Sequence, residues 1–419
     1  MNFKILLTAG LIVSAFATNA QDANKGFAIT GDGHNDYMWM NIRQIDLGTG
    51  QVTKSIFDRN KTNYNITDVA AKKTLSQTTI NDGTAYSASQ YPTASFVAAA
   101  AYDRRSEKLF FVPMRIGQLR WMDANVKNDA PDFYAVAIPN YKPSANADEN
   151  NNITRMVIAS DNNGYAITND GNHVYKFTTG KNPTITDLGA LIDAAENKGL
   201  SIHNKCSSWG GDMVADAFGK LYIISASRSI FVVDVNTLIA TYKGTIGGLP
   251  ANYTTNGAAV DADGTIILSS ATAFVGYYKL NLKELSTTKM EGSDVVYSAS
   301  DLASGNLLYQ KEAYQARANS FANVAGPSTK IVAADNTVFP NPVTGASFNL
   351  MLAGKYQGSY IVVVTDLAGR ALQTNRTNIA KGQQLQLINL QSRPTAGTYL
   401  VKVLDEKGTE ILSERVVFL

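Results

Sequence analysis

A single cysteine, Cys206, stands among the 419 residues of the chain. No disulfide can therefore form within the chain, and the fold must depend on the burial of apolar side chains. We interpret Cys206 as a small buried apolar residue rather than a nucleophile. An excess of one charge is lacking as well, because 17% of the residues are charged and the formal net charge is +2. This balance provides no strong attraction to nucleic acid, so we expect no nucleic-acid partner.

Long apolar runs are lacking except at the amino terminus, where one extends from Ile5 to about Phe16. Lys4 precedes this run, and the small residues Thr18 and Ala20 follow it. The run is shorter than the roughly 20 residues that span a bilayer, and its pattern is typical of a secretory signal peptide. We therefore predict a signal peptide over residues 1–20, export from the cytoplasm and no transmembrane segment.

A hairpin pattern returns five times between residues 26 and 312. Each copy has an apolar arm, a polar turn and a second apolar arm, which is typical of paired strands. Four copies follow a short arm of small residues that ends in aspartate, at Asp103, Asp161, Asp216 and Asp261. Units of about four strands that repeat every 40 to 58 residues or so predict a β-propeller, with the small-residue arms as crowded inner strands.

A sixth copy at residues 296–310 starts in the same way and then fades. We therefore predict an all-β protein with a propeller of six blades over residues 26–325, with five or seven blades left open. The first copy lacks the small-residue arm, so we expect the last copy to donate a strand and close the ring, which would remove exposed sheet edges. Residues 59–94 and 126–152 interrupt the repeat and are interpreted as polar loops.

The repeat stops before the stretch NTVFPNPVTG at residues 336–345. Pro340 and Pro342 fix φ and favour extended neighbours, so we expect a straight connector there, after a linker at residues 326–337. Residues 338–419 contain short alternating runs punctuated by glycines. This pattern predicts a small Ig-like antiparallel β-sandwich.

Four motifs in this segment follow one another in a fixed order: FPNP at 339–342, GSYIVVVTDLAGR at 358–370, AGTYLVKV at 396–403 and a terminal strand at 415–419. Together they resemble the carboxy-terminal sorting domain of the type IX secretion system, which is found in Bacteroidota. The motif residues are Pro340, Asn341, Pro342, Gly358, Tyr360, Asp366, Gly369, Gly397 and Tyr399. The resemblance implies passage through the periplasm, recognition by the outer-membrane secretion machinery, and secretion or attachment at the cell surface, often with removal of the domain.

Strand order in a propeller places the hairpin turns and the loops before the inner strands on one face. All three histidines fall in these segments, and we expect this face to bind the ligand. The candidate residues are Asp32, His34, Asp36, Arg115, His173, His203, Trp209, Asp212 and Arg228. Trp39 and Trp121 lie at similar places inside strands and are expected to pack between blades.

A calcium or zinc site would need Asp32, His34 and Asp36 to meet another histidine across the channel. The turn lacks the glycine placement of an EF-hand, so no cofactor is predicted, although calcium or zinc stays open. The sequence contains no G-x-S-x-G elbow, no P-loop and no G-x-G-x-x-G after a strand, and catalytic residues stay unknown. We favour non-catalytic binding of a glycan, peptide or protein. A secreted hydrolase or lactonase-like enzyme using the channel, and a structural envelope protein, stay open as alternatives.

Overall fold

The computed structural model describes most of the chain: residues 23–78, 91–126, 130–142, 148–315, 337–352, 358–379 and 385–419. The predicted signal peptide lies outside these residues, and so does the predicted linker except for Thr337. No helix in the described ranges is long and apolar enough to cross a membrane.

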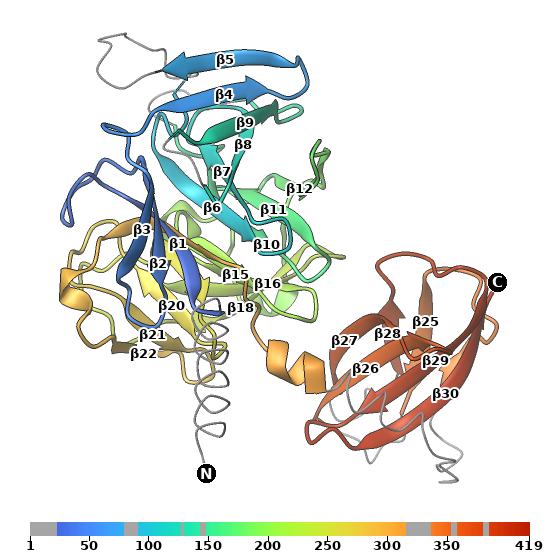
Figure 1. The fold of residues 1–419 in the computed structure, drawn as a ribbon. Coiled ribbons are helices and arrows are strands. Elements are labelled where there is room, and N and C mark those ends of the chain that lie inside the picture. Colours follow the sequence, from blue (N-terminus) through green and yellow to red (C-terminus); the bar gives the residue numbers. More distant parts are fainter. Residues whose placement is uncertain are drawn as a thin grey trace, which may run out of the picture. The chain divides into compact units, whose positions relative to one another are not determined.

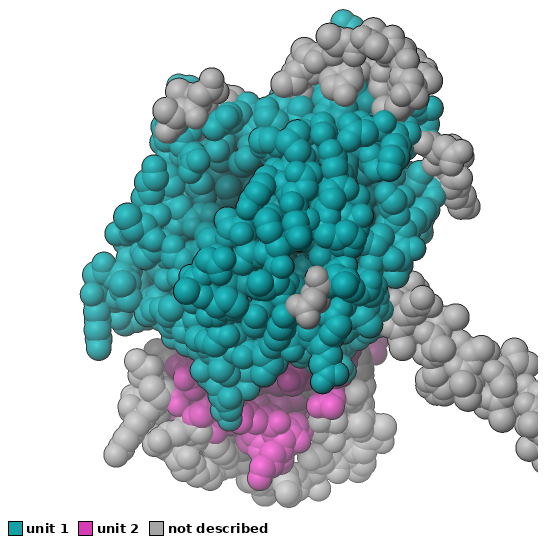
Figure 2. All heavy atoms as spheres, turned by 90° about the vertical axis from the view of Figure 1, so that its left-hand side faces the viewer, with its two compact units in different colours: residues 1–216, 220–308 teal, residues 217–219, 309–419 magenta. Residues whose placement is uncertain are grey.

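Two compact units make up the chain, and Figure 2 shows them in separate colours. The first unit comprises residues 1–216 and 220–308, and the second comprises residues 217–219 and 309–419.

The described strands of the first unit form five sheets (Figure 1). All neighbours within these sheets are antiparallel except β4 with β9 and β14 with β18. In sheet order, the first sheet contains β23 (Ala299–Ser304), β1 (Lys25–Thr30), β2 (Asn41–Asp46) and β3 (Val52–Phe57), and the second contains β6 (Val97–Asp103), β7 (Lys108–Pro113), β8 (Gln118–Asp123), β9 (Asp132–Ala137), β4 (Tyr64–Asp68) and β5 (Lys73–Thr78). The third sheet contains β10 (Ile153–Ile158), β11 (Asn163–Thr168), β12 (Val174–Thr178) and β13 (Ile185–Asp187), and the fourth contains β15 (Asp212–Ala215), β16 (Lys220–Ile224), β17 (Ser229–Asp234), β18 (Ile239–Thr245) and β14 (Ile192–Asp193). The fifth sheet contains β19 (Gly257–Val260), β20 (Ile266–Ser269), β21 (Tyr278–Asn281) and β22 (Ser286–Lys289).

The inner strands β6, β10, β15, β19 and β23 neighbour one another in a closed cycle. Small side chains allow this close approach, as in β6 with the sequence VAAAAYD and β19 with GAAV. The prediction that the small-residue arms form the inner strands is confirmed, and the unit has a propeller-like fold.

The ring closes through β23, which pairs with β1 from Gly26 opposite Ser304 to Thr30 opposite Ala299. The expected pairing of the two ends is therefore confirmed. The described residues of this unit contain five sheets rather than six, which favours the alternative of five blades. The sixth copy supplies one strand to the first sheet and no sheet of its own, which is why its pattern fades.

The two interruptions are only partly loops. Residues 59–94 contain β4 and β5, and β4 runs parallel to β9 and extends the second sheet. Tyr64 and Ile66 are buried in an apolar cluster, which explains why this polar segment forms a strand. The second interruption, residues 126–152, contains β9.

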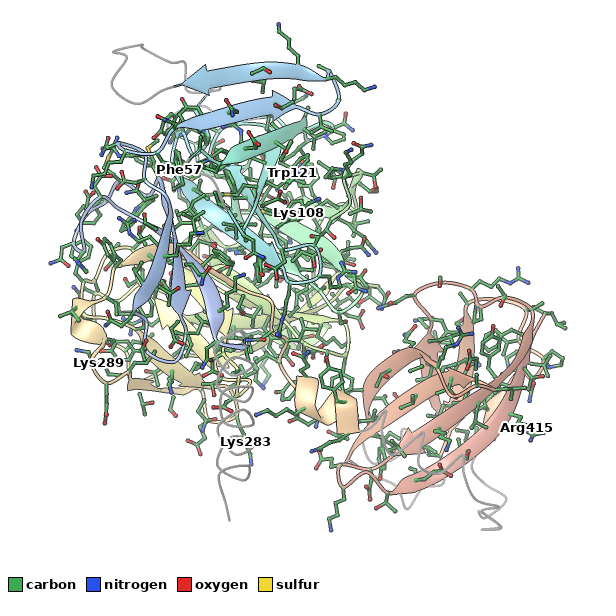
Figure 3. The ribbon with its side chains drawn as sticks, in the orientation of Figure 1. Phe57, Lys108, Trp121, Lys283, Lys289 and Arg415 are labelled. Carbon is green, nitrogen blue, oxygen red and sulfur yellow. The ribbon has the colours of Figure 1, made fainter. Side chains whose placement is uncertain are left out.

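Trp121 packs between two sheets, as predicted. Its side chain is 2% exposed (Figure 3), stacks on Phe110 and Tyr134 of its own sheet at centroid distances of 5.9 and 5.7 Å, and shares an apolar cluster with Tyr175 and Phe177 of the third sheet. Trp39 is partly buried against the cluster that contains Tyr64. Cys206 does not fit its prediction, because it is exposed on the short helix α2 (Lys205–Ser208).

Serine side chains join the closing strand β23 to β6, β20 and β19. Ser300 Oγ donates to Val97 O at 2.7 Å, Ser269 Oγ to Ala299 O at 3.1 Å and Ser304 Oγ to Val260 O at 2.9 Å. Because an inner strand is a sheet edge, its backbone groups need partners beyond their own ladder. These serines provide such partners and help to close a ring that has no disulfide.

The second unit contains two antiparallel sheets that share one apolar core. One sheet contains β24 (Thr337–Phe339), β25 (Ser347–Met351) and β28 (Leu385–Asn389), and the other contains β27 (Ala371–Ile379), β26 (Gly358–Asp366), β29 (Gly397–Leu404) and β30 (Glu410–Phe418). The core contains Val362 and Val401, and the central strands β26 and β29 are buried over most of their length. The Ig-like label stays a prediction.

The proline segment is not the straight connector that we expected. Residues 340–342 bend, and Asn341 bonds to the last strand. Asn341 Nδ2 donates to Arg415 O at 2.8 Å, and Val417 N donates to Asn341 Oδ1 at 2.9 Å. The segment therefore forms part of the second unit.

Candidate ligand-binding face and sorting domain

The turn face of the first unit consists of loops that the topology places at the same ends of the sheets. These are the β1–β2 turn (31–40), the β11–β12 turn (169–173), the loop before β15 (194–211), the loop before β19 (249–256), the β20–β21 loop (270–277) and the segment before β23 (296–298). Six of the nine predicted candidates lie in these loops. Arg115 and Arg228 lie in the matching β7–β8 and β16–β17 turns, and Asp212 begins β15.

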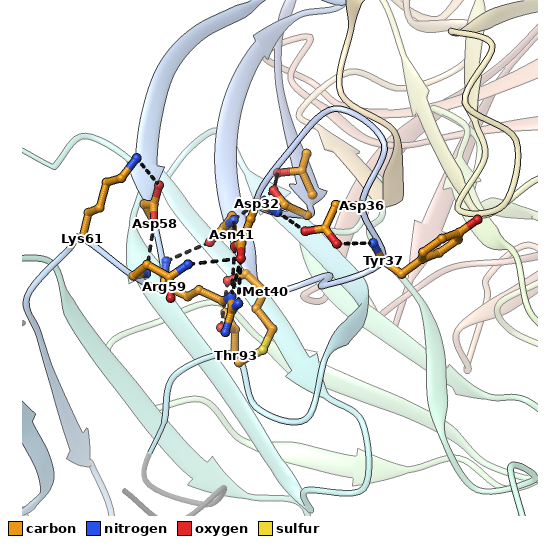
Figure 4. A network of polar contacts seen from close by, with 12 residues as sticks. Asp32, Asp36, Tyr37, Met40, Asn41, Asp58, Arg59, Lys61 and Thr93 are labelled. Atoms are coloured by element: carbon orange, nitrogen blue, oxygen red, sulfur yellow. Dashed lines mark hydrogen bonds and ion pairs between the residues drawn. The ribbon is translucent and has the colours of Figure 1, made fainter. Parts of the chain in front are cut away.

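Asp32 and Asp36 hold the β1–β2 turn together (Figure 4). The Asp32 carboxylate accepts hydrogen bonds from Arg59 Nε at 2.9 Å, Arg59 Nη2 at 2.6 Å, Asn41 Nδ2 at 2.9 Å and Asn60 Nδ2 at 3.1 Å. The Arg59 bond is the main reason why the pKa of Asp32 falls to about 2. Asp36 accepts the backbone N–H groups of Asp32 and Tyr37 at 2.7 and 2.8 Å. Both carboxylates therefore act in local structure.

The meeting of Asp32, His34 and Asp36 with another histidine, which a calcium or zinc site would need, is not found in the described residues. No group of three or more His, Cys, Asp or Glu side chains there has the arrangement of a metal site.

An aromatic cluster spans the first and fifth sheets and contains the exposed Tyr37 and the partly buried Trp39 and Phe274. Tyr37 is 57% exposed, and its ring lies 5.0 Å from that of Phe274 and 6.0 Å from that of Trp39, in edge-on geometry. His34, from the same turn as Tyr37, stacks on Tyr297 at 4.0 Å. Tyr37, Phe274 and Tyr297 were not among the predicted site residues. Their position in turn and loop sequences, where an aromatic side chain is less expected than in a strand, is the signal that could have identified them.

The other two histidines have separate partners. Nδ1 and Nε2 of His203 lie 2.6 Å from Asp170 O and 3.1 Å from Leu191 O, so this ring joins the loop before β15 to the β11–β12 turn. Trp209 Nε1 donates to His203 O at 3.0 Å. His173 Nδ1 lies 2.8 Å from an Asp187 carboxylate oxygen. His203 thus meets the turn that carries His173, while the His34 ring stacks on Tyr297 in the segment before β23.

Arg115 and Arg228 occupy matching turns, as predicted, with φ values of 62° and 73°. The Arg228 guanidinium donates to Tyr253 O at 3.2 Å and to Leu249 O at 3.4 Å, and also to Pro250 O and Ala251 O. It therefore holds the loop before β19 in place.

Three charged side chains lie inside the ring below the turn face. Arg155 is 0% exposed and donates to Gly210 O at 3.1 Å, to Thr168 O at 3.3 Å and to Ser208 O. Burial lowers the pKa of Arg155 to about 10. Asp212 and Asp301 are 1% and 0% exposed, and burial raises the pKa of each carboxyl well above its usual range. The sequence identified Asp212 and missed Asp301.

The predicted sorting residues of the second unit shape its turns and core. The Asp366 carboxylate accepts Arg370 N at 2.9 Å and Arg370 Nε at 2.7 Å, and Gly369 between them has a φ of 83° that favours glycine. Tyr360 and Tyr399 are buried in the core. The remaining motif residues flank strands: Pro340 and Pro342 follow β24, and Gly358 and Gly397 begin β26 and β29.

The second unit also matches a known family. Residues 337–417 match the family model described as "Secretion system C-terminal sorting domain". These residues are a type IX secretion sorting domain. The sorting domain marks the protein as secreted or attached at the cell surface and implies an interaction with the secretion machinery. No curated protein matches the chain.

Several solved structures are similar to the chain at low scores. PorZ, described as a surface component of the type IX secretion system of Porphyromonas gingivalis, is 16% identical with a TM-score of 0.33, over 94% of this chain and 51% of that one. A protein from Lactobacillus plantarum is 10% identical with a TM-score of 0.31, over 94% and 96% of the chains. A 6-phosphogluconolactonase-like protein from Bacteroides uniformis is 10% identical with a TM-score of 0.33, over 67% and 99%. The chain thus spans about half of PorZ, and these scores support no argument about function.

Proposed function

We propose that this protein is a non-catalytic glycan-binding protein of the cell surface, in which a five-bladed β-propeller carries the binding face. The sorting domain directs its export, and the aromatic cluster of the turn face contacts the glycan. The exposure of Tyr37 between Phe274 and Trp39 is the observation that carries this proposal.

Exposed aromatic rings suit the chemistry of sugars. The C–H face of a pyranose packs on a flat ring, while its hydroxyl groups need hydrogen-bonding partners at the edge. Tyr37 supplies a ring with a hydroxyl group, and the exposed Thr272 lies two residues before Phe274. Thr272 Oγ1 lies 2.7 Å from Thr254 Oγ1, so hydroxyl groups gather beside the cluster.

Binding is favoured over hydrolysis because the carboxylates near the cluster already have structural partners. A glycosidase needs two accessible carboxyl groups that flank the substrate bond. Asp32 binds Arg59, and Asp36 binds backbone N–H groups. Asp212 and Asp301 are buried out of reach of a substrate.

A glycan array followed by calorimetry with the best ligand tests the binding proposal. Tyr37→Ala should weaken binding at least about tenfold, because exposed tyrosines at the centre of a contact carry much of the binding free energy. Tyr314→Ala is the matched control, since Tyr314 is 56% exposed and belongs to the second unit. An array without a retained glycan, or a Tyr37→Ala variant that binds like the wild type, would contradict the proposal.

Truncation tests the export part of the proposal. A chain that ends at Asp335 lacks the matched sorting domain and should accumulate in the periplasm, which fractionation and surface proteolysis would measure. Surface display of this truncated chain at the level of the full chain would overturn the assignment of the export signal.

A further inference from the structure

The loop before β19 presents an amide group that is fixed in orientation and open on one side. Asn256 Oδ1 accepts Ala271 N at 2.9 Å and Thr254 Oγ1 at 2.5 Å. Because a backbone N–H can only donate, the Ala271 contact identifies the oxygen of the amide and turns Nδ2 away from it. Asn256 is partly exposed, and its Nδ2 group donates to no atom in the described part of the chain. Two N–H donors are therefore positioned for a ligand.

A similarly held asparagine on the same face uses its Nδ2 group within the protein. Asn169 Oδ1 also accepts a backbone N–H and a hydroxyl group, from Gly210 at 2.7 Å and from Thr154 at 2.9 Å. Its Nδ2 group then donates to Glu149 O at 3.1 Å. Asn256 has the same two kinds of anchor and, among the described residues, lacks the third bond, which suits a side chain that binds a ligand.

Hydroxyl groups connect this amide with the aromatic cluster. Thr272 Oγ1 lies 2.7 Å from Thr254 Oγ1, the group that also bonds Asn256. Thr272 is exposed, and Phe274 of the cluster follows two residues later in the β20–β21 loop. Since the chain from residue 271 to residue 274 spans at most about 11 Å, one oligosaccharide can reach the amide, the hydroxyl groups and the aromatic rings.

The charges around this surface favour a neutral ligand. The two loops, residues 249–256 and 270–277, contain no charged residue. On the other side of the cluster Asp36 accepts Tyr37 N at 2.8 Å (Figure 4), and this bond leaves the negative charge in place. Arg228 already donates to backbone carbonyl groups of the first loop. A carboxylated or sulfated sugar would therefore meet a like charge beside the exposed ring, which is unfavourable.

We propose that the turn face binds a neutral oligosaccharide across two subsites, the Tyr37 ring and the Asn256 amide with its neighbouring threonine hydroxyl groups. This inference rests on the proposed glycan binding and names the class of glycan. Sugar hydroxyl groups accept from Asn256 Nδ2 and donate to the threonine oxygens, while the apolar face of a sugar packs on the ring. Asn256 thereby determines specificity, because a site built to bond a hydroxyl group rejects a sugar that lacks it.

A glycan array with neutral, uronic-acid and sulfated oligosaccharides tests the class of ligand. The account predicts that the retained glycans are neutral. Calorimetry should show that a carboxylate in place of the C6 hydroxymethyl groups of the best neutral glycan weakens binding at least about tenfold. Retention of acidic glycans with equal or higher affinity would overturn the inference and leave glycan binding intact. An array that retains no glycan would overturn both.

Two asparagine variants of one loop test the amide. Asn256→Asp keeps an oxygen for Ala271 N and Thr254 Oγ1 but replaces the outward N–H donors. It should therefore weaken binding of the best neutral glycan at least about tenfold. Asn252→Asp adds the same charge to the same loop and should bind like the wild type, because Asn252 is exposed and bonds Thr272 through its backbone oxygen.

The outcomes separate this inference from the proposed function. Wild-type affinity of Asn256→Asp, together with impaired binding by Tyr37→Ala, would overturn the role of the amide and leave glycan binding in place. Equal losses in the two aspartate variants would overturn it as well, since they would report the added charge. If Asn256→Asp fails to fold, Thr272→Val decides: it removes an exposed hydroxyl group and should weaken binding about threefold or more. Unchanged affinity of that variant would contradict the second subsite.

Discussion

The two units of this chain close their sheets in different ways. In the first, β23 joins β1 from the other end of the unit, and serines link neighbouring inner strands. In the second, two sheets pack on each other, and the pairs β26–β27 and β29–β30 join strands that follow one another in sequence. Closure of the ring therefore depends on a pairing between the two ends of the unit. The sandwich combines local pairs with β25–β28 and β26–β29, in which the partners are separated by two other strands in sequence, and with apolar packing.

Charged side chains are buried in both units, with different partners. Arg155, Asp212 and Asp301 lie inside the ring with 0% or 1% exposure. In the second unit Lys402 is 2% exposed and lies 3.0 Å from a Glu410 oxygen, whereas the Asp366–Arg370 pair caps a turn with the Arg370 side chain 85% exposed. Loss of a buried charged residue of the ring should therefore cost more stability than loss of the exposed Arg370.

Loss of the closing strand should have the largest effect. A chain that ends at Tyr297 lacks β23 and should not unfold cooperatively, because β1 becomes an open edge and the inner ring loses one of its strands. A chain that ends at Gln315 keeps β23 and should unfold in one transition. Circular dichroism during heating compares the two, and cooperative unfolding of the shorter chain would break the comparison.

Removal of a buried guanidinium should have the second-largest effect on stability. Arg155→Met leaves three backbone carbonyl groups and Asp212 uncompensated and should lower the free energy of unfolding of the first unit by about 3 kcal/mol. Arg370→Met removes an exposed ion pair and should leave the stability of the second unit nearly unchanged. Urea unfolding measures both, and equal losses would contradict the contrast.

A side chain added where the inner strands pack closely should have a smaller effect on stability. A Cβ atom at Gly257 would lie 2.8 Å from Leu302 N and 2.4 Å from Ser269 Oγ, so Gly257→Ala should cost about 1 to 3 kcal/mol through overpacking. Gly345 in the second unit has no atom within 4 Å of that position. Gly345→Ala should therefore be nearly neutral in the same urea measurement, and a neutral Gly257→Ala variant would argue against tight contact between β19 and β23.

The surface ion pair of the turn face should give the smallest effect. The pKa of Asp32 falls from 3.8 to about 2 on folding, mainly through Arg59, so the folded state favours the ionised form. This stabilisation is complete above about pH 4 and disappears as the pH falls toward 2. Asp32→Asn should flatten the acid part of the stability profile slightly, because Asp32 is 34% exposed and solvent screens the pair. An unchanged profile in urea titrations across that range would exclude the linkage.

The sequence predicted features that local residue types determine. Asp366, Gly369 and Tyr399 form a turn and core contacts through nearby neighbours, so their motifs identify the second unit directly. The small side chains of β6 and β19 likewise predicted the inner strands.

Features that depend on distant partners were missed. The sequence ASDLAS of β23 suggested a separate sixth unit because its partner β1 lies at the other end of the ring. The polar residues around Tyr64 hid a strand that only its position beside β9 reveals. Asp301 and Tyr37 were missed for the same reason. The sequence alone does not show that the Asp301 side chain is buried and that the Tyr37 side chain is exposed.

Amide hydrogen exchange tests the closure of the ring most directly. Peptides that cover β1 (Lys25–Thr30) and β23 (Ala299–Ser304) can be followed by mass spectrometry in the full chain. The account predicts that both segments exchange together, as slowly as the central strand β11 (Asn163–Thr168), because they open only when the whole unit unfolds. Exchange of the β23 segment within seconds, while β11 stays protected, would show that this strand does not close the ring.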